Sequence, residues 1–389
     1  MSRINFLENF DYLKLDFVLI ALFFVLSFCG LLILASASVH FSDSIYGNPS
    51  AVFNRQFFYF LLGVSGLLIF FLLPLSFWSN FDRVLLTLGF LLLLLVFVPG
   101  VGVEVNGANR WIRFAGFGLQ PSEIMKFLSI LYVSCYSVRR IQEIQSHWLG
   151  FFRPALIIVS IISVILIQPD LGSSAVIFIS VLGVLFVAGV KLRQFLIVAL
   201  LGLIGISLMI IFVPWRWERI ISFVDPWSNP WGSGYQLTLS LMSIGRGDWF
   251  GVGLGQGLMK MGYLPDAHTD FIFSVIVEET GILGGLLIVS LLFGLSFRVF
   301  YIGRESLIRK NFFGFYFSYG VALLLGLHTF INVGVACGLL PTKGLTLPLI
   351  SAGGTNLIIV CLMIGIILRV DYENKNSMPV PNFNRRAKF

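Results

Sequence analysis

Apolar stretches recur along this 389-residue chain from about residue 17 to residue 368, and no polar block as long as a soluble domain separates them. A helix needs about 20 mostly apolar residues to cross the hydrocarbon core of a bilayer. The pattern therefore predicts about ten membrane-spanning helices. Their expected ranges are 17–37, 57–74, 84–99, 124–138, 154–168, 172–190, 195–213, 271–300, 315–338 and 348–368. We expect an all-α integral membrane protein in which residues 1–389 form a single polytopic domain.

The composition supports a membrane location. Hydrophobic residues make up 57% of the chain, and charged residues make up only 12%. Soluble domains have a charged fraction of roughly 25%, about twice as high. All four cysteines fall in or at the ends of predicted spans, and no short-spaced pair suggests a metal or redox site. We expect these cysteines to be small core residues.

The distribution of basic residues predicts the orientation of the chain. Lys and Arg gather in cytoplasmic loops of membrane proteins, and about two-thirds of the 26 Lys and Arg residues fall on the side of the two termini. We therefore expect residues 1–16 and 371–389 to be cytoplasmic tails and residues 214–270 to form a large outer loop between the seventh and eighth spans. The net charge of +7 is spread over the loops rather than gathered on one face, so we expect no nucleic-acid partner.

Two outer loops, about 100–123 and 214–270, hold most of the polar residues. The second loop is too long for a simple connector, and its tryptophan and tyrosine residues suit a position at the membrane surface. Within it, residues 235–244 alternate between leucine and polar residues, as a strand does. A helix would satisfy its own backbone hydrogen bonds near lipid, and we expect a helix there.

The segment 265–271 places two carboxylates and a histidine where the large outer loop meets an apolar span. Asp270 would be partly desolvated there yet reachable from water, which raises the pKa of a carboxyl group towards the range useful for a general base. The alternative is structural, with Thr269 as the N-cap and Asp270 in the first turn of the helix. His268 and Asp266 could join Asp270 at a metal, but these ligands alone specify none. A divalent cation such as Mg or Mn, carried by a phosphate-bearing substrate, stays open.

Charged residues elsewhere mark further candidates. Lys343 lies in a proline- and glycine-rich break before the last span, and it suits either an anionic substrate or a buried carboxylate. Arg110 in the first outer loop suits a phosphate. Glu123 and Lys126 follow a proline that starts a helix, and their spacing favours a pair. Asp170, in a tight turn between two spans, suits the cap of the next helix.

Two acidic residues and a glycine-rich stretch complete the candidate chemistry. Glu278 and Glu279 lie near the start of the long apolar run from 271, so we expect its membrane part to begin nearer Gly281. At least one of these carboxylates should face the bundle interior, and a structural ion pair and a catalytic role are equally open. Residues 251–257 are similar to phosphate-binding glycine loops but lack the strand and helix of a dinucleotide fold, so we expect a close-packed turn.

Distinctive blocks of sequence follow one another along the chain, at 107–112, 120–123, 168–172, 225–227, 232–236, 264–273 and 341–350. Together and in this order they resemble the SEDS family, the shape, elongation, division and sporulation membrane proteins, over nearly the whole chain. Blocks 225–227, 245–247 and 267–270 resemble the cell-division branch, and the elongation branch is the nearest alternative. The family often has Ser-Tyr-Gly-Gly-Ser-Ser at 351–356, where this chain keeps small residues but has Ala352 in place of the aromatic ring.

The resemblance implies a peptidoglycan glycosyltransferase that polymerises lipid II at the outer face of the bacterial inner membrane, at the division septum. The family's essential aspartate, in a His-Thr-Asp-Phe motif, corresponds to Asp270. A leaving pyrophosphate needs cationic stabilisation, and an acidic neighbour would hold each cation in place. On this basis the expected substrate-binding residues are Lys343, Arg110, Arg246, Glu279, Glu123 and Lys126.

Two other functions stay open. The same charges could serve a lipid II flippase, although no internal repeat of the kind seen in many transporters is visible. The chain could also act mainly as a scaffold. The resemblance implies a class B penicillin-binding protein transpeptidase and other divisome proteins as partners, besides lipid II and membrane lipid.

Overall fold

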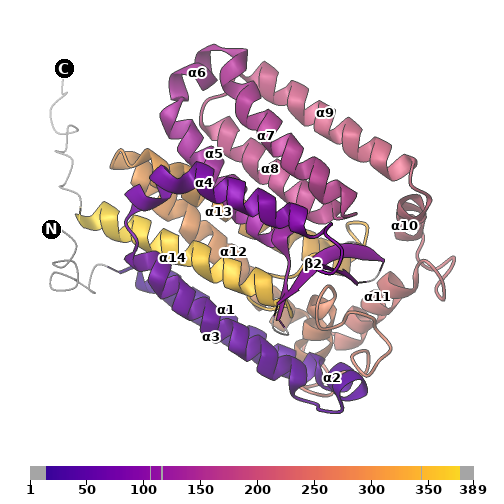
Figure 1. Cartoon of the computed structure of the whole chain (residues 1–389). Coiled ribbons are helices and arrows are strands. Elements are labelled where there is room, and N and C mark those ends of the chain that lie inside the picture. Colours follow the sequence, from indigo (N-terminus) through magenta and orange to yellow (C-terminus); the bar gives the residue numbers. More distant parts are fainter. Residues whose placement is uncertain (1–14, 106, 115–116, 343, 377–389) are drawn as a thin grey trace, which may run out of the picture.

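The computed structural model describes residues 15–105, 107–114, 117–342 and 344–376, which form a bundle of long helices and one small sheet (Figure 1). The helices are α1 (Phe17–Ala37), α2 (Val39–Tyr46), α3 (Ala51–Leu72), α4 (Leu75–Leu95), α5 (Pro121–Arg139), α6 (Ile141–Ser146), α7 (Trp148–Ile167), α8 (Leu171–Val187), α9 (Leu192–Ile211), α10 (Pro214–Val224), α11 (Tyr235–Gly247), α12 (Ile272–Ile308), α13 (Phe312–Ala336) and α14 (Gly354–Asn376). The strands are β1 (Gly102–Val105), β2 (Ala108–Phe114) and β3 (Phe117–Leu119).

The long apolar helices identify a multi-pass membrane protein. Among the described residues, eight helices are long and apolar enough to cross a bilayer, namely α1, α3, α4, α7, α9, α12, α13 and α14. Helix α8 is apolar but has only 17 residues, and α5 has 19 residues that include Glu123, Lys126 and Arg139. Each predicted span falls on one of these helices, which confirms the all-α membrane fold.

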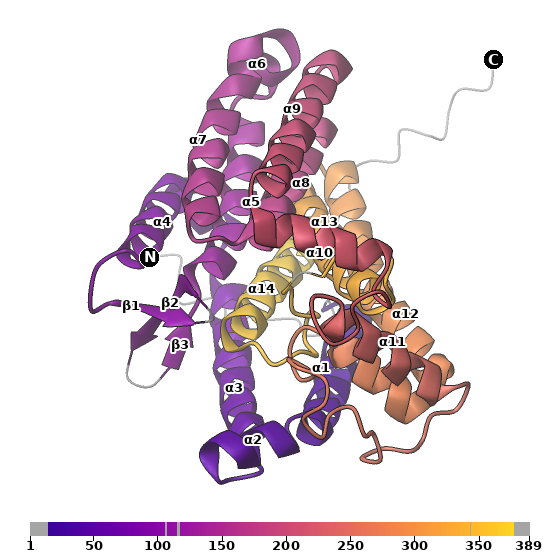
Figure 2. The same cartoon turned by 90° about the vertical axis from the view of Figure 1, so that its right-hand side faces the viewer.

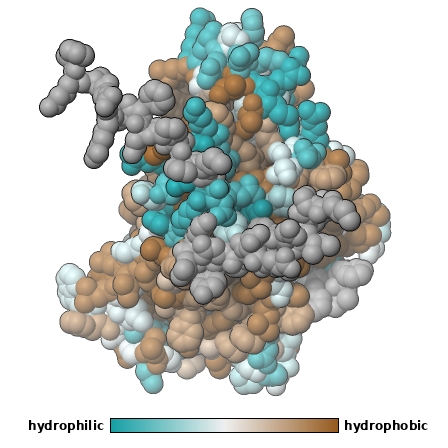
Figure 3. Space-filling view, turned by 90° about the vertical axis from the view of Figure 1, so that its left-hand side faces the viewer, coloured by the Kyte–Doolittle hydropathy of each residue, from teal (hydrophilic) through white to brown (hydrophobic). Residues whose placement is uncertain are grey.

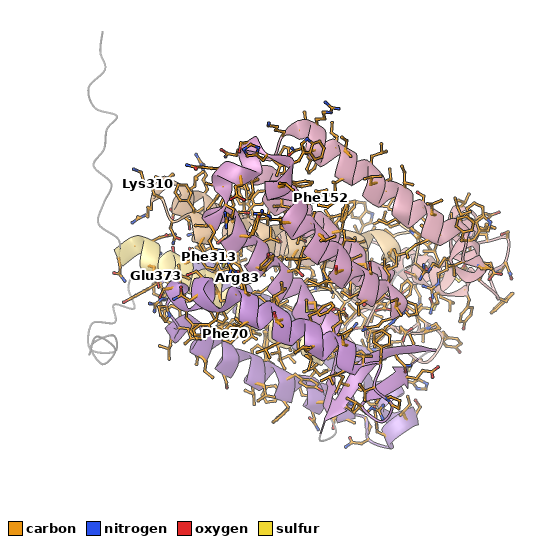
Figure 4. The ribbon with its side chains drawn as sticks, turned by 45° about the horizontal axis from the view of Figure 1, so that its top comes forward. Phe70, Arg83, Phe152, Lys310, Phe313 and Glu373 are labelled. Atoms are coloured by element: carbon orange, nitrogen blue, oxygen red, sulfur yellow. The ribbon has the colours of Figure 1, made fainter. Side chains whose placement is uncertain are left out.

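The polar connections gather at the two ends of the bundle. Figures 1 and 2 show α2, α10, α11 and the sheet towards one end, which we call the outer end. Helix α6 and the last turns of α14 lie at the opposite end, where Figure 3 shows hydrophilic surface beside apolar flanks. Figure 4 places Lys310 and Glu373 at this opposite end. The carboxylate of Glu373 accepts hydrogen bonds from Arg369 Nε at 2.6 Å and from the backbone N–H of Leu75 at 3.1 Å, so it ties α14 to α4.

Helix α14 forms the centre of the bundle, and α9 lies at its edge. In an 18-residue window of each helix, 83% of α14 is buried but only 6% of α9. Helix α14 packs mainly against α3. A Cβ atom added to Gly365 would lie 2.5 Å from the carbonyl oxygen of Leu67, so glycine is needed for this close approach of the two backbones.

The outer end contains one element that the sequence predicts and one that it does not. Helix α11 confirms the helix expected at 235–244. The hydroxyl of Ser240 lies 2.6 Å from that of Ser274 and donates to the carbonyl of Ala336 at 2.8 Å, so the polar residues of α11 bind α12 and α13. Their alternation with leucine therefore reflects buried hydrogen bonds rather than a strand. The antiparallel sheet β1-β2-β3, in contrast, occupies a region expected to be only a polar loop.

Helix α12 is interrupted at Gly281, which has φ 75° and ψ 178°. A Cβ atom at this position would lie 2.2 Å from the carbonyl oxygen of Trp249. Only glycine combines this backbone conformation with so close a contact. The break lies where the sequence predicts the membrane part of this run to begin, and Glu278 and Glu279 come just before it.

Candidate active site

A cavity of about 410 Å³ opens at the outer end, and we call it the outer cavity. Segments that are far apart in the chain line it. Its lining residues are Gly107, Ala108, Arg110, Pro169, Asp170, Leu171, Gly172, Arg219, Gln236, Asp266, Asp270, Phe271, Thr342 and Gly344. The sequence blocks 107–112, 168–172, 232–236, 264–273 and 341–350 therefore meet at one place.

Backbone contacts hold Asp270 at the cavity wall. The carbonyl of Asp270 accepts a hydrogen bond of 2.9 Å from the side-chain amide of Asn332, which also donates to the carbonyl of Leu345 at 2.6 Å. A Cβ atom at Gly344 would lie 2.8 Å from Asp270 Oδ2, so the absence of a side chain at Gly344 leaves room for the carboxylate. Helix α12 begins at Ile272 without a side-chain cap.

The structural alternative for this segment is wrong in both of its parts. Thr269 is not the N-cap of α12; its hydroxyl instead donates to the carbonyl of Asp266 at 3.2 Å. Asp270 likewise lies before the first turn of the helix, so its carboxylate is not a partner of the helix N-terminus. The side chain of Asp270 is half-buried and faces the cavity.

The surroundings of Asp270 raise its pKa close to neutral pH. Burial and the nearby Asp266 carboxylate raise the pKa of Asp270 to about 7, against the opposing effect of Arg219 and Arg110. Because a general base works best when its pKa lies near the operating pH, this carboxylate can accept a proton from a substrate in the cavity.

Two arginines face the same cavity. The guanidinium of Arg110 donates from Nε to the carbonyl of Gln168 and from Nη2 to that of Pro169, both at 2.8 Å. Arg219 Nη1 donates to the carbonyl of Thr342 at 3.3 Å. Burial lowers the pKa of Arg219, and the charge of Arg110 lowers it further against the attraction of Asp270. The two guanidinium groups therefore favour an anion in the cavity.

Arg219 is a site residue that sequence reasoning missed. It lies on α10, outside the sequence blocks that carry the resemblance, and its only signal was its position in the large outer loop. Lys343 is outside the described residues. Its chain neighbours Thr342 and Gly344 both line the cavity.

Asp170 has the structural role that the sequence predicts for it. It caps α8, since its Oδ1 accepts a hydrogen bond of 3.0 Å from the backbone N–H of Ser173. Its Oδ2 accepts another from the hydroxyl of Ser122 at 3.2 Å. The same residue lines the outer cavity, so the cap also orients a carboxylate beside Arg110.

The other expected substrate-binding residues lie in two separate clusters. Arg246 Nη1 lies 2.7 Å from Glu278 Oε1, and Lys260 Nζ lies 2.5 Å from Glu279 Oε1. We call these four residues the glutamate cluster. Glu278 also accepts hydrogen bonds from the backbone N–H groups of Leu258 and Met259, at 2.9 and 3.3 Å. None of the four lines the outer cavity as described.

The glycine-rich stretch 251–257 covers this cluster. The backbone N–H of Gly255 donates to Glu279 Oε2 at 3.0 Å. A Cβ atom at Gly251 would lie 2.3 Å from the carbonyl oxygen of Glu279. The expected close-packed turn is confirmed, and its backbone binds carboxylates of the protein itself.

The second cluster confirms the predicted pair of Glu123 and Lys126. Lys126 Nζ lies 2.7 Å from Glu123 Oε1 and 3.2 Å from His328 Nε2. The side-chain amide of Asn356 donates to Glu123 Oε2 at 2.9 Å. Glu123, Lys126 and His328 are buried, so this network joins α5, α13 and α14 inside the bundle.

His268 points away from the outer cavity. Its ring stacks obliquely on Phe41, with 4.1 Å between ring centroids, and burial lowers its pKa. It lines a second cavity of about 250 Å³ together with Arg55, Tyr59 and Trp111, among others. Over the described ranges, no group of three or more His, Cys, Asp or Glu residues is arranged to hold a metal ion. Cys135 and Cys361 are buried, and Cys29 and Cys337 are partly buried.

Comparisons with known proteins agree with this geometry. Residues 16–376 match the family model FTSW_RODA_SPOVE, described as cell cycle protein. The chain is 41% identical over 360 residues to a probable peptidoglycan glycosyltransferase FtsW of Saccharophagus degradans, covering 92% of this chain and 93% of that protein. It is 44% identical over 347 residues to the protein of the same name from Coxiella burnetii, covering 89% of this chain and 93% of that protein.

Solved structures give the same picture. A chain from a structure titled "Structural coordination of polymerization and crosslinking by a peptidoglycan synthase complex" superposes with a TM-score of 0.76 at 28% identity, covering 93% of this chain and 99% of that one. The rod shape determining protein RodA of Thermus thermophilus superposes with a TM-score of 0.69 at 27% identity, covering 93% of this chain and 98% of that one.

Proposed function

Because the chain belongs to the cell cycle protein family FTSW_RODA_SPOVE, we propose that it is a peptidoglycan glycosyltransferase that joins the disaccharide units of lipid II into glycan strands. Curated relatives named probable peptidoglycan glycosyltransferase FtsW support the reaction class. The observation that carries the assignment is the outer cavity, which is lined by a carboxylate with a pKa of about 7 and by two arginines.

In the reaction we propose, Asp270 accepts the proton of the acceptor sugar hydroxyl as that oxygen attacks the anomeric carbon of the donor. A glycosidic C–O bond forms, and the C–O bond to the lipid pyrophosphate breaks. The negative charge that develops on the pyrophosphate is stabilised by Arg110 and Arg219, both of which line the cavity. Lys343, which stands between Thr342 and Gly344 in the sequence, is a third candidate cation for this role.

The test is the substitution Asp270→Asn, which keeps the size of the side chain and removes the base. We expect polymer formation from purified lipid II to fall at least about a hundredfold. The matched control is Asp43→Asn, which changes an exposed carboxylate on α2 at the outer end and should leave polymerisation unchanged. The thermal midpoint of both variants would check folding. Full polymer yield from folded Asp270→Asn would refute the assignment.

A lipid II flippase is the alternative function, and an assay in liposomes can distinguish it from a glycosyltransferase. In liposomes that carry labelled lipid II in one leaflet, a flippase would move the lipid without making polymer. The glycosyltransferase proposal is supported by the position of Asp270, Arg110 and Arg219 in a cavity at one end of the bundle, because a transporter site usually lies near the membrane midplane.

We further propose that the protein acts in the bacterial inner membrane at the division septum, with a class B penicillin-binding protein transpeptidase and divisome proteins as partners. The structural similarity to a chain of a peptidoglycan synthase complex supports such a partner. We propose that a divalent cation, Mg or Mn, arrives with the pyrophosphate of the substrate. The Asp266 carboxylate at the cavity wall could contribute a ligand to such an ion, while Asp270 acts as the base.

A further inference from the structure

The cavity of about 250 Å³ that His268 lines lies between α2, α3, the sheet and the start of α14, and we call it the second cavity. Strand β2 and the segment 266–270 contribute to both cavities. Arg110 and Asp270 line the outer cavity, whereas Arg113 and His268 line the second one, and no described residue lines both. Successive side chains of a strand point to opposite faces, so β2 presents Arg110 to one cavity and Arg113 to the other. The second cavity is therefore a separate site behind the wall that carries Asp270.

The two cavities differ in the charge of their walls. Three aspartates and two arginines line the outer cavity. Among the described residues of the second cavity there are also two arginines, Arg55 and Arg113, but neither Asp nor Glu. His268 is neutral at neutral pH, because burial lowers its pKa. The positive charge of the second cavity is not offset by carboxylates at its wall, so this cavity favours an anion.

Buried hydrogen bonds hold the second cavity in shape. The side chain of Gln56 on α3 is only 5% exposed. Its amide nitrogen donates to the carbonyl of Ser351, and its Oε1 accepts from the backbone N–H of Gly353, both at 3.2 Å. The backbone N–H of Ala352 donates to the carbonyl of His268 at 2.9 Å. These bonds tie α3 to the segment that carries Asp270, so the cavity is preformed.

Aromatic rings line the same cavity, and close glycine contacts fix two of them. A Cβ atom at Gly118 would lie 3.3 Å from Trp111 Cε3, and one at Gly354 would lie 2.3 Å from Tyr59 Cε2. Both rings therefore pack directly on backbone. Tyr46 on α2 also lines the cavity and is exposed. Tyrosine and tryptophan are typical of the boundary between membrane and water, where one side of the ring is apolar and the other is wet.

The position of Arg55 places the cavity at the level of the lipid headgroups. Arg55 lies near the start of α3, a helix long and apolar enough to cross a bilayer. Phe57 and Phe58 follow it and are exposed, as are Arg55 and Arg113 themselves. A membrane lipid beside α3 can therefore bring its phosphate to the two arginines while its tail stays against apolar side chains.

From these observations we propose that the second cavity binds the phosphate group of a membrane lipid between Arg55 and Arg113, with the lipid tail along α3. Guanidinium groups bind phosphate oxygens through paired hydrogen bonds, and the aromatic rings cover the apolar atoms next to the phosphate. An anionic phospholipid and a lipid-linked pyrophosphate both carry this group. Either lipid would contact the segment that carries Asp270 through His268, which lines the second cavity.

Two substitutions test the proposal in different ways. Arg113→Gln removes one positive charge, and Ala352→Tyr keeps both arginines but fills space in the cavity with a ring that the family often has at this position. The matched control is Arg193→Gln, which removes an exposed arginine near the start of α9. The purified full-length proteins would be titrated by calorimetry with short-chain phosphatidylglycerol, an isoprenoid pyrophosphate and inorganic pyrophosphate. The thermal midpoint of each variant would check folding.

We expect the unmodified protein to bind at least one of the two lipids more tightly than inorganic pyrophosphate. Arg113→Gln should weaken this binding about tenfold, as the loss of one charge-assisted hydrogen bond does. Ala352→Tyr should weaken it at least as much, and Arg193→Gln should leave it unchanged. The isoprenoid pyrophosphate also fits the outer cavity, so for this probe only one of two sites should weaken.

The lipid whose binding weakens identifies the source of the phosphate, and either lipid supports the proposal. Unchanged affinity for both lipids in folded Arg113→Gln and Ala352→Tyr would overturn it. Equal affinity of the unmodified protein for inorganic pyrophosphate would also overturn it, because the cavity would then not select a lipid. None of these measurements depends on polymerisation, so a failure to make polymer would count against the proposed function alone.

Discussion

The outer cavity and the glutamate cluster are built from the same residue types, carboxylates beside basic side chains at the outer end, yet they differ in how the charges are satisfied. Glu278 and Glu279 are buried, and each has a basic partner and backbone N–H donors. Asp270 is partly buried at the wall of a cavity, and its pKa is raised to about 7. The fully paired cluster stabilises the fold, whereas the carboxylate left open to a cavity is available for proton transfer.

The largest expected effect is a loss of stability when the glutamate cluster is broken. Glu279→Ala leaves Lys260 buried without its partner, and we expect it to lower the free energy of unfolding by about 3 to 5 kcal/mol. The control Glu143→Ala breaks surface pairs with Arg140 and Arg153 and should cost about 1 kcal/mol or less. Denaturant unfolding in detergent would measure both. Unchanged stability together with lost polymerisation in Glu279→Ala would move this residue into the catalytic site.

The next effect compares two arginines, one from each region. Arg219→Ala removes a cation from the outer cavity, and we expect kcat/KM for lipid II to fall about a hundredfold with little change in stability. Arg246→Ala removes the partner of Glu278, and we expect lower stability with nearly normal kcat/KM for the folded fraction. Steady-state kinetics and unfolding of both variants would measure the difference. The reverse result would assign pyrophosphate binding to Arg246.

The smallest effect is a change in pH dependence. Asp270 must be ionised to accept a proton, so kcat/KM should rise with pH through an inflection near 7. Asp266→Asn removes a carboxylate that raises the pKa of Asp270, so the inflection should move to lower pH. The profile of Asp43→Asn should match that of the unmodified protein. An inflection that stays in place in Asp266→Asn would mean that another group is titrating.

The stability of the protein should depend on the same ionisation, but it should fall with rising pH, whereas kcat/KM rises. The pKa of Asp270 is raised on folding from 3.8 to about 7, so the folded state binds the proton more tightly. The stability that protonation provides is therefore complete below about pH 4 and is lost as the pH rises through about 7. The difference in thermal midpoint between the unmodified protein and Asp270→Asn should change over this window, and a constant difference would contradict the raised pKa.

Much of the architecture followed from short-range pattern. The predicted spans and the helix at 235–244 depend on composition or backbone preferences within a few residues. The pair of Glu123 and Lys126 could also be predicted, because a spacing of three residues places both on one side of a helix. The sheet at 102–119 could not be predicted, since its alternation is short and polar residues interrupt it.

The sequence by itself determined that this is a multi-span membrane protein with a carboxylate at Asp270 poised between an outer loop and a span. Only the tertiary structure decided which charges share a cavity with it. Arg110 and Arg219 do, whereas Arg246 is bound to Glu278, although all three arginines lie in outer loops. The physical reason is that contacts between residues far apart in the chain depend on how whole helices pack. That packing is set by many weak side-chain contacts, which no local motif records.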